Sequence, residues 1–269
     1  MTDALIAYSL RGTATAPGPV LLTPAERALI KSSAIRAWHP AHLCNIEAGE
    51  GWPESIAGSV AALVPSTSLS GGVVMPTWEA SGGPADQPFI NGTGTNIDSR
   101  LIGDGLPSDG PWTIAAVCKR GSSAAAVAFG AVGNSGTAVG VRLPSGASME
   151  VRSFASGGSG TARISASFTA VHGVSDWYYV MLCFSAATGL KLFVGGDAAG
   201  TNAYSTQNNR AKYSLFGPQD ETDDLAINDF RDGAIASAII AAGDASVDAD
   251  LKALIDGAVF SRFPALAAD

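Results

Sequence analysis

The sequence predicts an all-β domain, a sandwich or a barrel, with one short helix near each end. Short strand-like segments recur about every ten residues and are separated by Gly, Pro, Asn and Ser, which is the spacing typical of such folds. The chain has 269 residues, of which 46% are hydrophobic and 15% charged. It can therefore bury a sizeable core, and its composition is not that of a disordered chain.

The first expected element is a helix that begins after Thr23. Thr23 is the N-cap, a proline follows it, and Glu26 stands three residues after the cap. This pattern is a capping box with Pro at the first helical position. Pro40 restricts His39 to extended conformations, so we expect the helix to end near Trp38.

A linker-like segment separates this helix from the strands. Residues 65–72 read Pro-Ser-Thr-Ser-Leu-Ser-Gly-Gly, which is typical of loops. We therefore expect an N-terminal arm over residues 1–72, used for attachment or oligomerisation. A β domain over residues 73–262 and a tail over 263–269 follow it.

The expected strands are short apolar runs bounded by turn residues. They are residues 112–119, 125–130, 137–143, 148–154, 162–168, 177–185, 190–194 and 234–241.

The strand at residues 177–185 is apolar on both faces. One face carries Trp177, Tyr179, Met181 and Cys183, and the other Tyr178, Val180, Leu182 and Phe184. We expect it to lie centrally, between two covered surfaces. Ala-Ala-Thr-Gly at residues 186–189 predicts a turn, after which 190–194 returns antiparallel.

The last expected element is a helix over residues 246–256. Ser246 is its expected cap, Asp248 and Asp250 lie in the first turn, where the helix dipole favours acids, and Gly257 closes the helix.

Three of these segments resemble the laminin-G-like, concanavalin-A-like jelly-roll superfamily. They are the hairpin at 176–196, the closing strand with its helix at 229–256, and Trp-Thr-Ile-Ala-Ala-Val at 112–117. The resemblance covers about residues 75–262 and implies an antiparallel jelly-roll β-sandwich. This fold hosts lectins, hydrolases, adhesion modules and virion proteins. The low-charge, Gly/Ala/Ser-rich composition is most similar to tailed-phage head decoration or fibre proteins.

The formal net charge of −8 lies wholly in the last fifth of the chain. Residues 1–216 carry equal numbers of acidic and basic side chains, and the excess of acids falls in 217–269. A nucleic-acid binder needs a basic patch, so the charge argues against that class.

Targeting signals are not expected. The N-terminus lacks the basic and apolar regions of a signal peptide. The longest apolar run, 233–243, is shorter than the roughly 20 residues that span a bilayer. Cys44, Cys118 and Cys183 are an odd number without a close pair, which predicts free thiols. We expect synthesis in a host cytoplasm and no membrane insertion.

An acidic run at residues 220–224 is the sharpest candidate for a metal site. Ca²⁺ prefers six to eight oxygen ligands, which such a run can supply, although Leu225 stands where an EF-hand requires Gly. The alternative is a solvated acidic face. The candidate Ca²⁺ ligands are Asp220, Asp223, Asp224 and Asp229.

A polar loop over residues 200–210 is the candidate glycan contact, because it combines amides and hydroxyls with an aromatic ring. The alternative is a loop that is polar for solvation alone. The candidate residues are Asn202, Tyr204, Asn208 and Asn209.

The sequence shows no catalytic constellation. A retaining glycoside hydrolase needs two carboxyls about 5–5.5 Å apart, and no Glu-x-Asp-x-x-Glu strand is present. His39, His42 and Cys44 have the chemistry of zinc ligands, but no second Cys/His pair follows, as a four-ligand site requires.

These observations predict a non-enzymatic virion structural protein, a phage head decoration or fibre component located in the virion. Its expected partners are other virion proteins, further copies of the chain and a cell-surface glycan. The alternative is a lectin-like carbohydrate-binding module outside a virion. A glycoside hydrolase is the third and weakest hypothesis.

Overall fold

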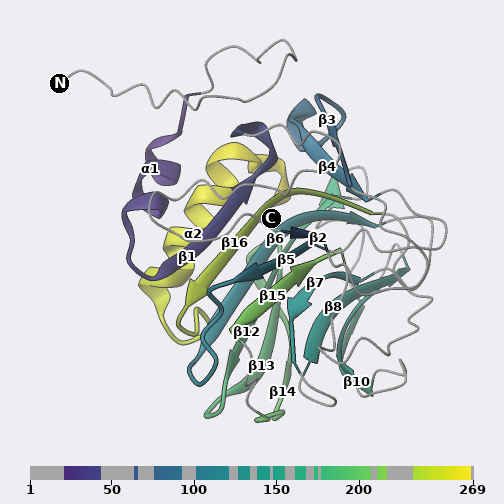
Figure 1. Ribbon diagram of the computed structural model, residues 1–269, viewed down its shortest axis with the longest axis vertical. Helices are drawn as coiled ribbons and strands as arrows, with labels where there is room; N and C mark the ends of the chain where they lie inside the picture. The colour runs from purple at the N-terminus through teal and green to yellow at the C-terminus, as the bar shows by residue number, and fades with distance from the viewer. Residues whose placement is uncertain are drawn as a thin grey trace.

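The chain folds into two antiparallel β-sheets that pack face to face, with helices on the outer side of one sheet (Figure 1). The computed structural model describes residues 21–43, 64–65, 76–92, 101–120, 127–133, 138–145, 148–154, 161–167, 173–174, 177–206, 211–216 and 233–267. The prediction of an all-β antiparallel jelly-roll sandwich with a short helix near each end is confirmed.

The first sheet, which we call sheet 1, has the strand order β14-β13-β12-β6-β16-β4-β3, with β1 also paired to β16 and β11 to β12. Its strands are β14 (Asp197–Asn202), β13 (Gly189–Val194), β12 (Trp177–Ser185), β6 (Trp112–Arg120), β16 (Gly233–Ala242), β4 (Phe89–Gly92), β3 (Thr77–Glu79), β1 (Ile35–Pro40) and β11 (Gly173–Val174).

The second sheet, sheet 2, has the order β10-β9-β8-β7-β15-β5-β2. Its strands are β10 (Thr161–Ser167), β9 (Ser148–Phe154), β8 (Ala138–Ser145), β7 (Val127–Ala131), β15 (Lys212–Leu215), β5 (Leu101–Asp104) and β2 (Val64–Pro65). The helices are α1 (Pro24–Lys31) and α2 (Ala249–Arg262), with 3-10 turns η1 (Ala41–Leu43), η2 (Pro84–Asp86) and η4 (Pro264–Leu266).

All the strands that the sequence predicted between residues 112 and 241 are confirmed, with ends that agree to within two residues. The prediction for β12 also holds, because its two sets of side chains fall into two separate apolar clusters. Tyr178, Val180, Leu182 and Phe184 lie in the core between the sheets. Trp177, Tyr179, Met181 and Cys183 lie in the layer between sheet 1 and the helices.

The predicted extent of the first helix is wrong. The capping box forms as expected, with Thr23 Oγ1 accepting from the Glu26 backbone N–H, but α1 ends at Lys31. Residues 35–40 instead form β1 and pair with β16, because pairing buries Ile35 and Trp38, which outweighs local helix propensity. The expected boundary at residue 72 lies outside the described residues.

The predicted bounds of the second helix also need correction. Its N-cap is Asp248, whose side chain accepts from the Leu251 N–H, because Ser246 donates its hydroxyl to Asp244 instead. The helix continues through Gly257 to Arg262.

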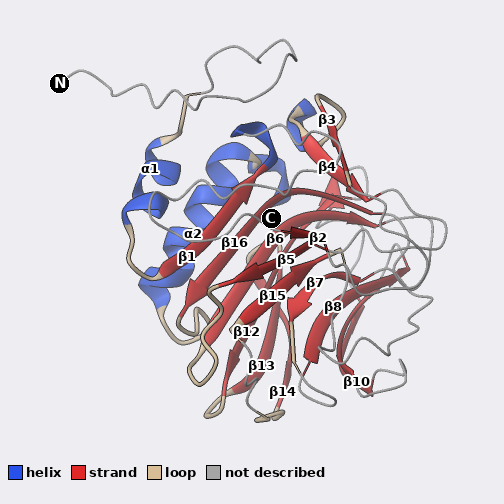
Figure 2. Cartoon of the chain, viewed as in Figure 1, coloured by secondary structure: helices blue, strands red, loops and turns tan. Residues whose placement is uncertain are grey.

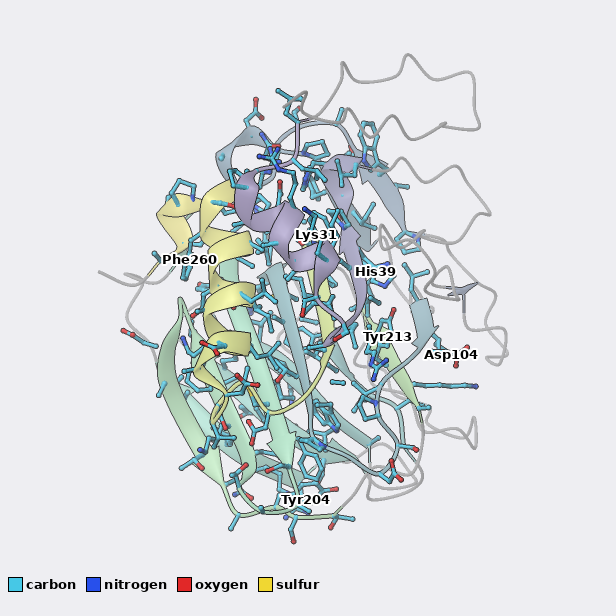
Figure 3. The ribbon with its side chains drawn as sticks, turned by 90° about the vertical axis from the view of Figure 1, so that its left-hand side faces the viewer. Lys31, His39, Asp104, Tyr204, Tyr213 and Phe260 are labelled. Carbon is cyan, nitrogen blue, oxygen red and sulfur yellow. The ribbon has the colours of Figure 1, made fainter. Side chains whose placement is uncertain are left out.

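Helices α1 and α2 lie side by side and cover the outer face of sheet 1 (Figures 2 and 3). Leu29 of α1 and Ile255 and Val259 of α2 join the apolar cluster of that face. Each fully buried side chain of this kind contributes roughly 1.5–3 kcal/mol. None of the helices in the described ranges combines the length and the apolar character needed to cross a membrane.

Candidate functional site

The described part of the predicted glycan segment lies where β14 of sheet 1 meets β10 of sheet 2. Residues 200–202 belong to β14 rather than to a loop. The Asn202 Nδ2 donates to the Arg163 carbonyl oxygen at 2.6 Å, and its Oδ1 accepts from the Tyr204 N–H at 3.0 Å. The Nδ2 atom of Asn202 therefore joins the edges of the two sheets, while its Oδ1 makes a local turn contact.

Tyr204 is buried, so its ring is not presented outward as a glycan contact requires. Its side chain is 8% exposed and packs near the Phe184 ring, while the Arg163 guanidinium lies 4.8 Å from its centroid. Burial raises the pKa of the Tyr204 hydroxyl. Figure 3 shows Tyr204 at the end of the sandwich far from α1.

The other predicted ligands lie outside the described residues. They are the two glycan candidates Asn208 and Asn209 and the four Ca²⁺ candidates Asp220, Asp223, Asp224 and Asp229. Within the described ranges, no three His, Cys, Asp or Glu side chains gather closely enough to hold a metal ion.

The outward side of strands β8, β9 and β10 forms a polar surface that we call the open face. Its members alternate with core residues such as Val141, Met149, Val151 and Ile164, so they point away from sheet 1. They are Arg142, Glu150, Arg152 and Ser165.

The open face is a compact set of charged groups. Arg152 Nε donates to Glu150 Oε2 at 2.9 Å, and Arg142 Nη1 lies 4.0 Å from the same oxygen. All three side chains are about a fifth exposed, and Ser165, directly opposite Glu150, is exposed. Guanidinium donors, a carboxylate acceptor and a hydroxyl therefore lie together on the outer side of this sheet.

The two described histidines serve structural contacts in different layers. His39 of β1 and Tyr213 of β15 join the two sheets through a 2.5 Å hydrogen bond in the interior (Figure 3). His42 of η1 lies on the other side of sheet 1, at Glu26 of α1. His39 and His42 therefore lie on opposite sides of sheet 1 and do not share a metal site.

The two ends of the described chain meet in a polar cluster that we call the terminal junction, formed by Glu26, His42 and Arg262. Arg262 Nε and Nη2 donate to the two Glu26 carboxylate oxygens at 2.9 and 2.6 Å. His42 Nε2 lies 3.3 Å from Glu26 Oε1. The Thr23 N–H also donates to this carboxylate.

The ion pair controls the protonation of Glu26. The side chain is 1% exposed, and burial alone raises its pKa. The adjacent His42 ring and the hydrogen bonds from Arg262 outweigh burial and lower the pKa to about 2. Sequence reasoning placed Glu26 in a capping box but missed Arg262, which lies 236 residues away and has no local signal.

A further polar cluster around Asp256 fixes α2 to sheet 1. The Tyr179 hydroxyl donates to Asp256 Oδ1 at 2.7 Å, and Lys252 donates to Asp256 and to the Gly196 carbonyl. Burial raises the pKa of Tyr179, so the phenol stays protonated as a donor.

The described thiols are unreactive by position. Cys118 and Cys183 are buried and unpaired, and burial raises the pKa of each to about 12. A thiol acts as a nucleophile only as a thiolate, so neither is prepared for catalysis.

Solved structures show the same fold in a group of toxin binding domains. The binding domain of Paraclostridial Mosquitocidal Protein 1 is similar with a TM-score of 0.54 at 11% identity, over 86% of this chain and 53% of that chain. The binding domain of Botulinum neurotoxin DC in complex with rat synaptotagmin II has a TM-score of 0.50 at 10% identity, over 86% and 52%. The Botulinum neurotoxin serotype D binding domain has a TM-score of 0.50 at 10% identity, over 87% and 53%.

The chain therefore spans about half the length of these structures, and the likeness establishes the fold alone. No protein-family description and no curated protein matches the sequence.

Proposed function

We propose that this chain is a non-catalytic binding module that recognises a cell-surface glycan through the open face. The proposal rests on which polar side chains are buried and which face outward. The described histidines and thiols are buried in the fold, whereas Arg142, Glu150, Arg152 and Ser165 are presented outward on strands. Sites built on rigid strands hold such donors and acceptors in fixed geometry.

The fold supports a binding role, because the similar solved structures are binding domains. One of them is described in complex with a protein, rat synaptotagmin II, so a protein ligand is the competing outcome. A glycan suits this face because sugar hydroxyls both donate and accept hydrogen bonds, and the open face offers both functions.

A glycan array with the full chain tests the proposal. We expect binding to a restricted set of glycans that is lost in the Arg142→Ala/Arg152→Ala double variant. No signal with or without Ca²⁺ would remove glycan recognition.

The segment with Asn208 and Asn209 remains a second proposed contact. Asn202 and Tyr204 are used inside the fold, so the proposal for this segment now rests on the two later asparagines. The Asn208→Ala/Asn209→Ala variant should weaken array binding if they contact the glycan, and unchanged binding would remove them.

Calcium binding by Asp220, Asp223, Asp224 and Asp229 also remains a proposal, supported by the density of carboxylates in the sequence. Calorimetric titration should show heat and a rise in melting temperature at millimolar Ca²⁺. The Asp223→Asn/Asp224→Asn variant should lose both. Absence of both effects in the natural chain would contradict the proposal.

We further propose that the module is a virion component that assembles with other virion proteins and with copies of itself, on the basis of its composition. Deleting residues 1–70 would remove β1 and the buried Trp38, whereas deleting residues 1–20 leaves every described residue. The shorter deletion should fold but lose incorporation into particles or self-association, and normal assembly would refute an attachment role for residues 1–20.

A further inference from the structure

We propose that α1 is an acid-sensitive flap, which detaches from α2 in mildly acidic solution while β1 stays in sheet 1. The flap would be controlled at the terminal junction by His42. This inference is independent of the glycan proposal.

Helix α1 is held by the terminal junction and by a small apolar contact. Only Glu26 and Leu29 are buried among its eight residues. An isolated helix of this length is marginal in water, and burial of one leucine contributes roughly 2 kcal/mol. Ile30 adds a partly buried apolar contact with the same apolar cluster as Leu29, and the Thr23 and Ser261 hydroxyls form a hydrogen bond of 2.8 Å between α1 and α2.

Strand β1 is held much more firmly. All its residues except Arg36 are buried, it is paired along β16, and Trp38 Nε1 donates to Ser237 Oγ. The chain between α1 and β1 turns at residues 32–34. Helix α1 can therefore open without loss of the strand.

His42 is buried beside Glu26 in the terminal junction. Its side chain is 3% exposed, and neither ring nitrogen has a hydrogen-bond partner among the described residues, although Nε2 lies 3.3 Å from Glu26 Oε1. A proton added to this ring would place a second cation in a buried site that already holds the Arg262 guanidinium.

The groups that face His42 come from every neighbouring element. Helix α1 contributes Glu26, and α2 contributes Arg262. Strand β1 contributes the edge of Trp38, 6.1 Å between ring centroids, while its Arg36 is exposed and its His39 is bonded to Tyr213. Strands β4 and β16 also pack on η1 and contain no ionisable side chain.

The sign of the effect follows from these contacts. Burial lowers the pKa of His42 below its usual 6.5, more than Glu26 raises it. Once α1 opens, His42 takes up a proton at its usual pKa, so the closed state is fully favoured above pH 6.5 and loses stability as the pH falls below it. Glu26 acts in the same direction only at lower pH, between 4.5 and about 2.

Hydrogen exchange measured by mass spectrometry on the full chain at pH 7.5 and 5.5 tests the flap. After correction for intrinsic rates, the opening of residues 25–32 should increase by up to about tenfold, the limit set by protonation of one histidine. Protection of β1 and β12 should stay unchanged. Equal loss in β1, or no change in α1, would overturn the proposal.

Two variants test whether His42 causes the pH dependence of α1 opening. His42→Gln, which cannot titrate, should abolish the pH dependence of α1, and His172→Gln should preserve it. The same dependence in His42→Gln would overturn the proposal. If His42→Gln does not fold, NMR titration of the natural chain decides, because the His42 ring and the Leu29 methyl signals must shift together. Independent titration of the two would overturn the proposal.

Discussion

The outer faces of the two sheets are completed in opposite ways. The outer face of sheet 1 carries Trp177, Tyr179 and Met181 and is covered by α1 and α2. The described outer face of β8, β9 and β10 carries Arg142, Glu150 and Arg152. The covered face provides stability, whereas the open face is the one that we propose binds a ligand.

On the covered face, polar contacts and apolar burial have different roles. Polar contacts of Glu26, Arg262, Tyr179 and Asp256 fix the helices in one position, while apolar burial supplies the energy. Substitutions on the two faces should therefore separate stability from binding.

The largest expected effect on the covered face is that of Trp38→Ala. Loss of this buried ring, and of its hydrogen bond to Ser237, should lower the free energy of unfolding by about 3–5 kcal/mol. Urea denaturation measures this. Val247→Ala, at a side chain that is 64% exposed, is the control and should change stability by less than about 0.5 kcal/mol. Equal effects would contradict the assignment of β1 to the core.

Arg262→Ala should destabilise by about 3 kcal/mol, because it leaves the buried Glu26 carboxylate without its main partner. The Glu26→Gln/Arg262→Ala double variant should recover part of this loss, since no buried charge remains. Thermal and urea unfolding of the three proteins would show it. A loss in the double variant at least as large as that in Arg262→Ala would contradict the buried ion pair.

Thr23→Ala should cost about 1 kcal/mol, the usual effect of losing an N-cap, since Thr23 Oγ1 accepts from the Glu26 N–H. Ser33→Ala, at an exposed position after the helix, is the matched control and should be close to neutral. A neutral Thr23→Ala in chemical denaturation would show that the cap does not limit stability.

The smallest effect on stability is expected on the open face. Arg152→Ala removes a partly exposed ion pair and should change the free energy of unfolding by less than about 0.5 kcal/mol. A loss of 2 kcal/mol or more would show that this face is structural.

The sequence was sufficient for the strands because their pattern is local. The apolar side chains of β12 alternate between its two faces, and each face packs in a separate apolar layer. The sequence-based prediction failed for β1, which it assigned to a helix. A capping box and a following proline indicate only where a helix can begin and must end. They do not indicate that Ile35 and Trp38 gain more by pairing with β16.

The candidate site was less predictable for a physical reason. The sequence pattern of a polar side chain in a turn-like segment does not tell whether it faces water or joins two sheet edges. Asn202 joins two sheet edges. The open face was missed because Arg142, Glu150 and Arg152 lie on different strands, and their proximity follows from strand register. Alternation within β9, from Met149 to Ser153, was the one available signal.

The central claim, that binding belongs to the open face, is tested most directly by affinity. Isothermal titration with the strongest glycan from the array should compare the natural chain with Arg152→Ala and with Lys191→Ala. Lys191 of β13 lies between Leu190 and Leu192 of the inter-sheet core and so points to the helix side. Arg152→Ala should weaken binding at least tenfold, about 1.4 kcal/mol, with Lys191→Ala unchanged. Unchanged affinity in Arg152→Ala, or an equal loss in Lys191→Ala, would contradict the claim.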